Sequence, residues 1–146
     1  MVKLQLNLGE NWHEYTGTKQ VYATPMTRLE YNQYRGWELP ADENGADSGY
    51  LVEYIDGGKA NHPDHHGCIS WSPAEVFANA YTRSSTPKDR IRNEQADLLD
   101  KITKAQAFIS KSKPDFMTNE AWGLLLDQVK VQNEYYEILT KRYKLM

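Results

Sequence analysis

The sequence lacks most of the features that mark exported, membrane-spanning or common nucleotide-binding proteins. Cys68 is the only cysteine, so no disulfide can form within the chain. No apolar run approaches the roughly 20 residues that a membrane-spanning helix needs, and the amino terminus lacks the basic and apolar stretches of an export signal. The glycine-rich phosphate fingerprints of the Rossmann and P-loop folds are also missing. We therefore expect a cytosolic protein that uses neither of these nucleotide-binding folds.

The charge balance disfavours binding to DNA or RNA polymers. The 146 residues include 17 Lys/Arg and 20 Asp/Glu, giving a net charge of −3, whereas proteins that bind nucleic acid without sequence preference carry a basic surface. Residues 1–83 have a net charge of −5 and residues 84–146 a net charge of +2. This shift, together with the polar segment 82–86, predicts two domains at 1–83 and 84–146.

The first part has the pattern of a small antiparallel sheet with short helices. Apolar and polar residues alternate at residues 2–8, as in a half-buried strand. The sequence Tyr50–Ile55 is rich in β-branched and aromatic residues and is followed by an Asp-Gly-Gly turn. Strands are predicted at residues 2–8, 19–24, 50–55 and 68–71.

Two helix starts can be read from capping residues. Thr27 and Glu30 form the pattern of a capping box, and Gly36 supplies the left-handed residue that ends the helix. Ser72 is followed by proline, alanine and glutamate, the pattern of a capping serine with proline in the first helical position. This second helix is expected to run to about Tyr81.

The second part is predicted to be a long helical hairpin. Thr86 and Pro87 mark the start of a helix of some six turns, and a second helix is expected at residues 119–143. Because the turn between them is short, the two helices should lie antiparallel. The predicted inward stripe of the second helix consists of Leu125, Gln128, Gln132, Tyr135, Leu139 and Arg142, with a second apolar stripe of Leu124, Val131, Ile138 and Leu145.

That apolar sector is wider than one partner helix can cover, so we expect the hairpin to pack on another copy of itself or on the first part. The whole chain is thus predicted to be an α+β protein that forms a homo-oligomer. Polar residues on the inward stripe would either fix the register of the assembly or lie at the edge of a broad face. The cations Lys88, Arg90, Arg92, Lys101 and Lys104 are expected on a solvated face, with a phosphate contact as the alternative.

Aromatic and basic residues gather around the first short helix and indicate a small-molecule site. Tyrosine and tryptophan could simply pack this helix on the sheet. However, Arg35 and Lys59 could neutralise phosphate, and the amides at the Ser72 helix start could bind an anion. The predicted ligand-binding residues are Arg28, Tyr31, Tyr34, Arg35, Trp37, Tyr54, Lys59, His62, Trp71 and Ser72.

Metal binding and catalysis receive little support. The segment His62–Cys68 contains five groups able to bind zinc, yet catalytic sites normally draw ligands from separated elements. A polar loop is the simpler interpretation. No serine stands on a nucleophile elbow, and Cys68 lies in an apolar strand where thiols are usually inert. We therefore predict no catalytic residues, no metal and no cofactor.

A family resemblance adds a specific function. The segment from MTRLEYNQYRGWELPADE to ISWSPAEVFANAY, at residues 26–81, resembles a small domain common in accessory genes of tailed phages. The segments DRIRNEQADLLDKITKAQAF and EYYEILTKR resemble helical-hairpin modules from phage genomes. Such small phage proteins include anti-defence sponges, which bind nucleotide messengers of bacterial immunity without cleaving them.

The resemblance implies a sponge for ADP-ribose derivatives made by TIR enzymes in Thoeris systems, such as 3′-cyclic or histidine-linked ADP-ribose. It would act in the cytoplasm of the infected bacterial host. A sponge for the cyclic oligonucleotides of CBASS is the alternative within this class. Two rivals come from other classes: an inhibitor that binds a host defence enzyme through the same aromatic residues, and an enzyme that cleaves nucleotides with the His62–His66 loop.

Overall fold

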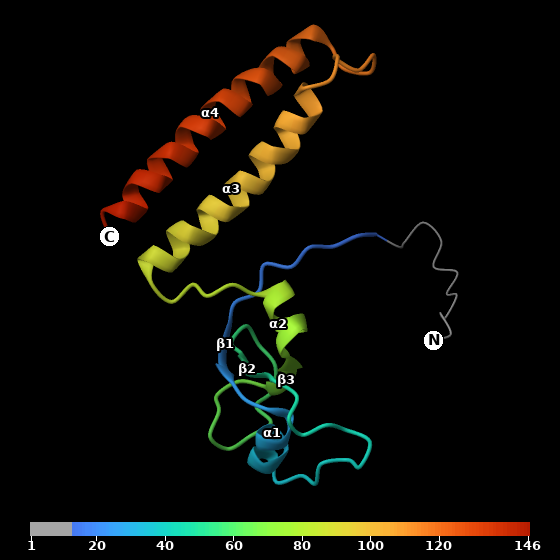
Figure 1. Cartoon of the computed structure of the whole chain (residues 1–146). Coiled ribbons are helices and arrows are strands. Elements are labelled where there is room, and N and C mark those ends of the chain that lie inside the picture. The colour runs from blue at the N-terminus through green and yellow to red at the C-terminus, as the bar shows by residue number, and fades with distance from the viewer. Residues whose placement is uncertain (1–12) are drawn as a thin grey trace. The chain divides into compact units, whose positions relative to one another are not determined.

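A computed structural model describes residues 13–146, which form two compact units that divide between Ala80 and Tyr81 (Figure 1). The first unit holds a three-stranded antiparallel sheet and two short helices, and the second holds a pair of long helices. The predicted α+β class, with a small sheet followed by a helical hairpin, is confirmed. The predicted strand at residues 2–8 lies outside the described residues.

The sheet consists of β1 (Val21–Pro25), β2 (Gly49–Tyr54) and β3 (Ile69–Pro73), in the order β1-β2-β3. Gly49 is required at the start of β2 because a Cβ there would come within 2.4 Å of the Trp71 ring and of the Ser72 carbonyl oxygen. This close approach lets the Trp71 side chain cross the end of the neighbouring strand.

Helix α1 (Arg28–Arg35) begins and ends as its sequence predicts. Thr27 accepts a hydrogen bond from the Glu30 amide, the Glu30 side chain accepts one from the Thr27 amide, and Gly36 closes the helix with a φ of 72°. Tyr31 then points into the sheet and forms the core of this unit with Leu51 and Ile69. The caps therefore fix which face of α1 is buried.

Helix α2 (Ala74–Ala80) begins later than predicted. Ser72 and Pro73 belong to β3, where they pair with Tyr50 and Gly49 of β2. The predicted serine cap with proline in the first helical turn is therefore wrong. Pairing with β2 extends the strand through Pro73, and in the described residues β3 is an edge strand, where proline is tolerated. Phe77 of α2 stacks on Tyr50, with ring centroids 4.1 Å apart.

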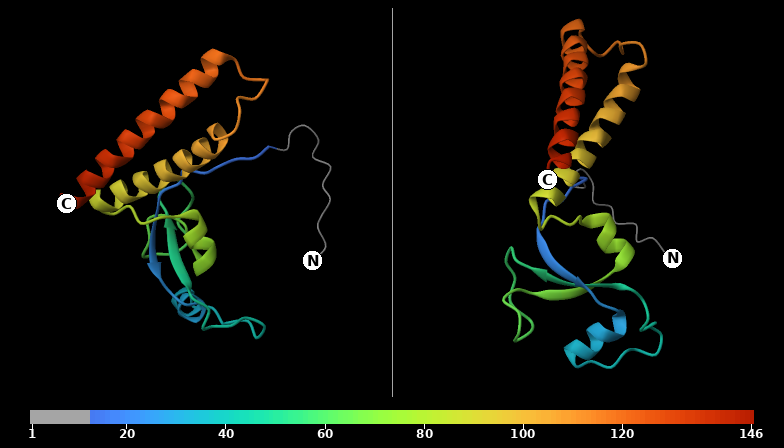
Figure 2. Two further views of the ribbon diagram at one scale, coloured as in Figure 1. Left: turned by 45° about the horizontal axis from the view of Figure 1, so that its top comes forward. Right: turned by 60° about the vertical axis from the view of Figure 1, so that its left-hand side comes forward.

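The second unit consists of α3 (Pro87–Ile109) and α4 (Asn119–Lys144), which run side by side in opposite directions (Figure 2). Thr86 caps α3 in a capping box with Asp89, and Pro87 occupies the first turn as predicted. Thr118 caps α4. No helix in residues 13–146 has both the length and the apolar character needed to cross a membrane.

The hairpin core follows a seven-residue repeat on each helix. Ile91, Leu98 and Ile102 of α3 pack with Leu139 of α4, whose side chain is fully buried. The predicted inward stripe of α4 is only half correct, because Gln128, Tyr135 and Arg142 are exposed. A stripe that starts at Trp122 and continues in steps of three and four residues fits the inward face better, because its positions are buried or half-buried and include large aromatic side chains. The inward residues are Trp122, Leu125, Val129, Gln132, Tyr136, Leu139 and Tyr143.

Candidate functional site

The ten predicted ligand-binding residues do not form a single site. Tyr31 is only 5% exposed and belongs to the core. Burial raises the pKa of its hydroxyl, while the neighbouring Arg35 guanidinium opposes that rise through its charge and a hydrogen bond. Tyr31 therefore belongs to the core beneath α1 and is not available for direct contact with a ligand.

Arg28 and Trp71 are occupied by contacts within the fold. The Arg28 guanidinium binds both carboxylate oxygens of Glu43 at 2.7 Å and lies 5.0 Å from the Trp71 ring centroid. The Trp71 indole nitrogen donates to the Met26 carbonyl at 2.8 Å. These side chains brace the acidic loop that follows α1 against the sheet.

Three further predicted residues lie apart from α1. Ser72 lies inside β3, and the Ala74 amide donates to the Ser48 carbonyl at 3.0 Å, so this end of α2 is not the open anion site that the sequence suggested. The Tyr54 hydroxyl contacts Ser70 at 3.1 Å. Lys59 is exposed in the loop between β2 and β3.

The remaining predicted residues gather at the C-terminal end of α1. We call Tyr34, His62, His65 and Glu53 the tyrosine–histidine cluster. The Tyr34 ring stacks on His62 with centroids 4.4 Å apart, and its hydroxyl lies 2.7 Å from Nε2 of His65. Nδ1 of His65 donates to Glu53, which comes from β2. A helix, a strand and a loop thus meet at one imidazole.

The loop that carries the histidines is fixed at its base. The Asn61 amide group donates to the carbonyl of Ile69 at 2.9 Å, and its oxygen accepts from the Ile69 amide at 2.7 Å. Nδ1 of His62 accepts from the Asp64 amide at 3.2 Å. The histidines are therefore positioned by the fold before any ligand binds. Among the described residues, no group of three or more His, Cys, Asp or Glu side chains could hold a metal ion.

The cluster also changes the acidity of Glu53. The hydrogen bond from His65 holds the pKa of this carboxyl below its usual value, and the Gly67 amide and the charges of His65 and His66 act in the same direction. Glu53 is therefore ionised at neutral pH and fixes the orientation of the imidazole.

Arg35 and Trp37 lie next to the cluster in the sequence. The Arg35 guanidinium carbon is 4.4 Å from the Trp37 ring centroid, and Trp37 is 52% exposed. Within the described residues, Nη1 of Arg35 is buried and has no hydrogen-bond partner. Arg35 and Trp37 therefore form a partly exposed cation–π pair at the end of α1 that also carries Tyr34, and such groups can stack on a base and bind phosphate.

Sequence reasoning missed Glu53 and His65. Glu53 is a charged residue at an inward-facing position of a strand whose neighbour Leu51 is buried. A carboxylate at such a position needs a partner, and that requirement was the available signal. Nothing local indicated that the partner would be His65, because the contact depends on the path of the loop.

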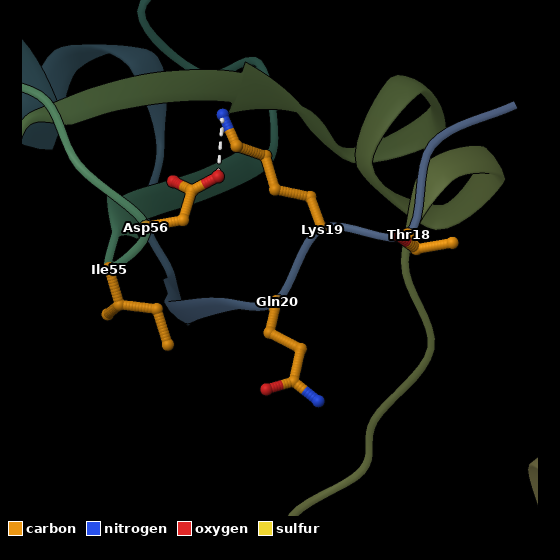
Figure 3. Close-up of a pocket in the computed structure, with 5 residues that line it drawn as sticks. All are labelled: Thr18, Lys19, Gln20, Ile55 and Asp56. Atoms are coloured by element: carbon orange, nitrogen blue, oxygen red, sulfur yellow. Dashed lines mark ion pairs between the residues drawn. The ribbon is translucent and has the colours of Figure 1, made fainter. Parts of the chain in front are cut away.

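A surface pocket of about 590 Å³ lies elsewhere on the first unit (Figure 3). Lys19 bridges it by an ion pair with Asp56 at 3.5 Å, and its ammonium lies 4.6 Å from the Tyr54 ring centroid. Tyr54 is the one predicted site residue that this arrangement contacts. The pocket is lined by Thr18, Lys19, Gln20, Ile55 and Asp56.

On the hairpin, cations gather around Tyr143, which lies near the end of α4. Arg92 donates to the Tyr143 hydroxyl, and the Lys88 ammonium lies 4.6 Å from the Tyr143 ring centroid. The hydrogen bond with Arg92, supported by the charges of both cations, lowers the pKa of this tyrosine. A phenol and two cations in contact form a second surface that suits an anionic ligand.

The outer side of α4 carries exposed apolar residues. Leu124, Val131, Ile138 and Leu145, which we call the outer seam, recur every seven residues and are 64, 61, 54 and 89% exposed. Helix α4 therefore carries two apolar seams. The inward residues form one, which α3 covers, and the outer seam is the other.

Comparison with known proteins bears on this second unit. Residues 85–145 match the family model described as Sequestin. The Sequestin match begins one residue before the cap of α3 and ends one residue after α4, so it coincides with the hairpin. Such a match is consistent with a protein that sequesters a partner. No curated protein and no solved structure matches the chain.

Proposed function

We propose that the protein is a phage-encoded sponge that holds a nucleotide messenger of bacterial immunity and does not cleave it. The observation that carries the proposal is the Sequestin match over residues 85–145. The phage origin and the site of action, the cytoplasm of the infected host, rest on the sequence resemblance. Holding a messenger at nanomolar affinity requires about 12 kcal/mol of favourable binding free energy.

An ADP-ribose derivative is the messenger that best suits the side chains. A pyrophosphate matches a guanidinium such as that of Arg35, and an adenine ring matches the exposed faces of Tyr34 and Trp37. Each stacked base contributes about 1–3 kcal/mol. The CBASS cyclic oligonucleotides carry the same two kinds of group and are the alternative ligands. The net charge of −5 on residues 1–83 opposes anion binding at long range, so the contacts must be local.

Self-association is the second part of the proposal. The outer seam is an apolar stripe of heptad spacing on a helix whose other seam is already covered. Exposed apolar stripes of this kind usually mark an interface, and a second copy of α4 offers the same spacing for packing. An oligomer would also multiply the number of binding surfaces per particle.

A capture experiment tests the function. The protein is incubated with 3′-cyclic ADP-ribose, histidine-linked ADP-ribose and 3′,3′-cyclic GMP-AMP, freed of unbound ligand and heat-denatured, and the released molecules are identified by mass. Recovery of an intact nucleotide is expected. A changed mass would indicate an enzyme, and no uptake would favour an inhibitor that binds a host protein.

Paired variants locate the binding surface. If the first unit binds the messenger, Arg35→Ala together with Trp37→Ala abolishes capture, and Lys88→Ala with Arg92→Ala leaves it intact. The reverse result would place the messenger on the hairpin. Lys104→Ala is the matched control, because Lys104 is an exposed cation of α3 whose ion pair is with Asp100, four residues earlier.

A further inference from the structure

The three side chains Glu53, His65 and Tyr34 form a continuous chain of hydrogen bonds. A carboxylate can only accept, so Nδ1 of His65 carries the hydrogen that it donates to Glu53. In a neutral imidazole the other nitrogen then has a lone pair. The Tyr34 hydroxyl, 2.7 Å away, therefore donates to Nε2 and has no hydrogen left for a ligand.

Protonation of His65 reverses the second bond. Both ring nitrogens of an imidazolium are donors, so Nε2 donates to the Tyr34 oxygen. The phenolic hydrogen is released and can point away from the imidazole. Because Tyr34 is 37% exposed, this hydrogen can reach solvent or a bound molecule.

We propose that Tyr34 donates a hydrogen bond to an anionic oxygen of the ligand, and that binding is coupled to uptake of one proton by His65. The ligand class is a phosphate or pyrophosphate, because protonated His65 adds a positive charge behind the Tyr34 hydroxyl. Arg35, the next residue of α1, has a buried guanidinium nitrogen with no partner in the described residues. The inference rests on the proposed function and adds its dependence on pH. It also gives a role to the contact between a tyrosine, an imidazole and a carboxylate at one surface.

The groups around His65 determine which controls are needed. Glu53 on β2 is its anionic partner, and Tyr34 on α1 contacts the opposite nitrogen. The His62 ring lies edge to face with His65, with centroids 5.4 Å apart. His66 acts on Glu53 through its charge. Tyr22 of β1 is the cross-strand neighbour of Glu53. Since His62 and His66 also gain charge on acidification, each must be separated from His65.

Calorimetry with ADP-ribose measures the coupling directly. The diester phosphates of this ligand do not titrate near neutral pH, so proton uptake reports on the protein. Binding enthalpies measured in buffers of different ionisation enthalpy should reveal proton uptake of up to one proton per site. Affinity should rise as the pH falls, by at most about tenfold per pH unit, which is the limit for uptake of one proton.

Four substitutions assign the proton. His65→Gln should bind ADP-ribose with no proton uptake and with a flatter pH profile. Tyr34→Phe should also lose the uptake and should bind more weakly at every pH. His62→Gln and His66→Gln should keep the uptake. Wild-type binding without uptake, or the same uptake in His65→Gln, would overturn the inference.

An NMR titration separates this inference from the proposed function. The imidazole nitrogens of His65 should show hydrogen on Nδ1 at pH 8, and 50 mM sulfate, an anion that does not titrate in this range, should raise the pKa of His65 in the wild type but not in Tyr34→Phe. If none of the three nucleotides of the capture experiment is taken up while sulfate produces this shift, the sponge proposal is wrong and the proton-coupled site stands. If sulfate and ADP-ribose both leave His65 unchanged, the site is refuted.

Discussion

Arg28 and Glu43 are joined by two hydrogen bonds of 2.7 Å each, from Nε to Oε2 and from Nη2 to Oε1. The pair connects the first turn of α1 to the acidic loop after that helix. Arg28 therefore stabilises the loop in the free protein, although the sequence predicted it as a ligand-binding residue.

Disrupting this pair should lower stability without affecting ligand capture. The side chains are 30 and 33% exposed, so solvent screens them only in part. We expect Glu43→Gln to lower the free energy of unfolding by about 1 kcal/mol, measured by urea denaturation. A double-mutant cycle with Arg28→Ala isolates the pair. The same cycle on Asp100 and Lys104, an exposed pair on α3, should give about 0.3–0.5 kcal/mol; equal coupling in the two cycles would contradict the structure.

The hairpin core should depend strongly on Leu139. Its side chain has no solvent exposure and contacts the buried residues of α3. Leu139→Ala should lower the free energy of unfolding of the second unit by about 2–5 kcal/mol. Leu124→Ala is the matched control on the same helix, because Leu124 is 64% exposed. Leu124→Ala should lower the free energy of unfolding much less than Leu139→Ala does. Both variants are measured at low protein concentration, where subunits are separated.

Charges on the outer seam should separate the subunits. Val131→Glu with Ile138→Glu places two carboxylates in the proposed interface, where their desolvation is unfavourable. Sedimentation velocity should show an oligomer for the wild type and a monomer for the double variant, with unchanged helix content by circular dichroism. Lys130→Glu with Glu137→Lys, at neighbouring exposed positions, provides the control. A wild-type monomer at all concentrations would remove self-association from the proposal.

The Glu53–His65 contact should make stability sensitive to acid. The pKa of Glu53 is lower in the folded protein than the ordinary value of 4.5, chiefly because of the hydrogen bond from His65. A carboxyl with a lowered folded pKa stabilises the protein above the unfolded value and loses that contribution as the pH falls through the folded value. Glu53→Gln should therefore be less stable than the wild type at pH 7, and the difference should shrink below pH 4.5.

Urea denaturation between pH 7 and pH 3 tests this dependence. His65→Gln should return the pKa of Glu53 towards its ordinary value, as measured by NMR of the carboxyl carbon. A pKa of Glu53 at or above 4.5 in the wild type would contradict the contact.

The parts of the fold that could be predicted from sequence are those fixed by neighbouring residues. Thr27 and Thr86 use side chains within three residues of the backbone amides that they cap, and Gly36 supplies a left-handed backbone, so their sequence patterns were sufficient. Ser72 shows the limit of this approach. Its local pattern is that of a helix cap, but pairing with β2 keeps it in a strand.

The site was harder to predict because its contacts join distant segments. Tyr34 and His62 were both selected by residue type, and the structure stacks them on each other. Glu53 and His65, which orient that pair, are twelve residues apart and were not selected. On α4 the predicted stripe was shifted because aromatic residues such as Trp122 and Tyr136 were left out of the inward face, although both are half-buried and Tyr136 packs against the hairpin core.

Each unit assembles its buried residues from its own helices and strands: Tyr31, Leu51 and Ile69 in one, and Ile91, Leu98, Ile102 and Leu139 in the other. Recombination near residue 81 would therefore leave both sets of packing contacts whole. A gene fusion could join this hairpin to an unrelated domain, or the first unit to another hairpin, without disturbing the packing inside either one. Variation in such proteins should accordingly arise by exchange of entire modules as well as by point mutation.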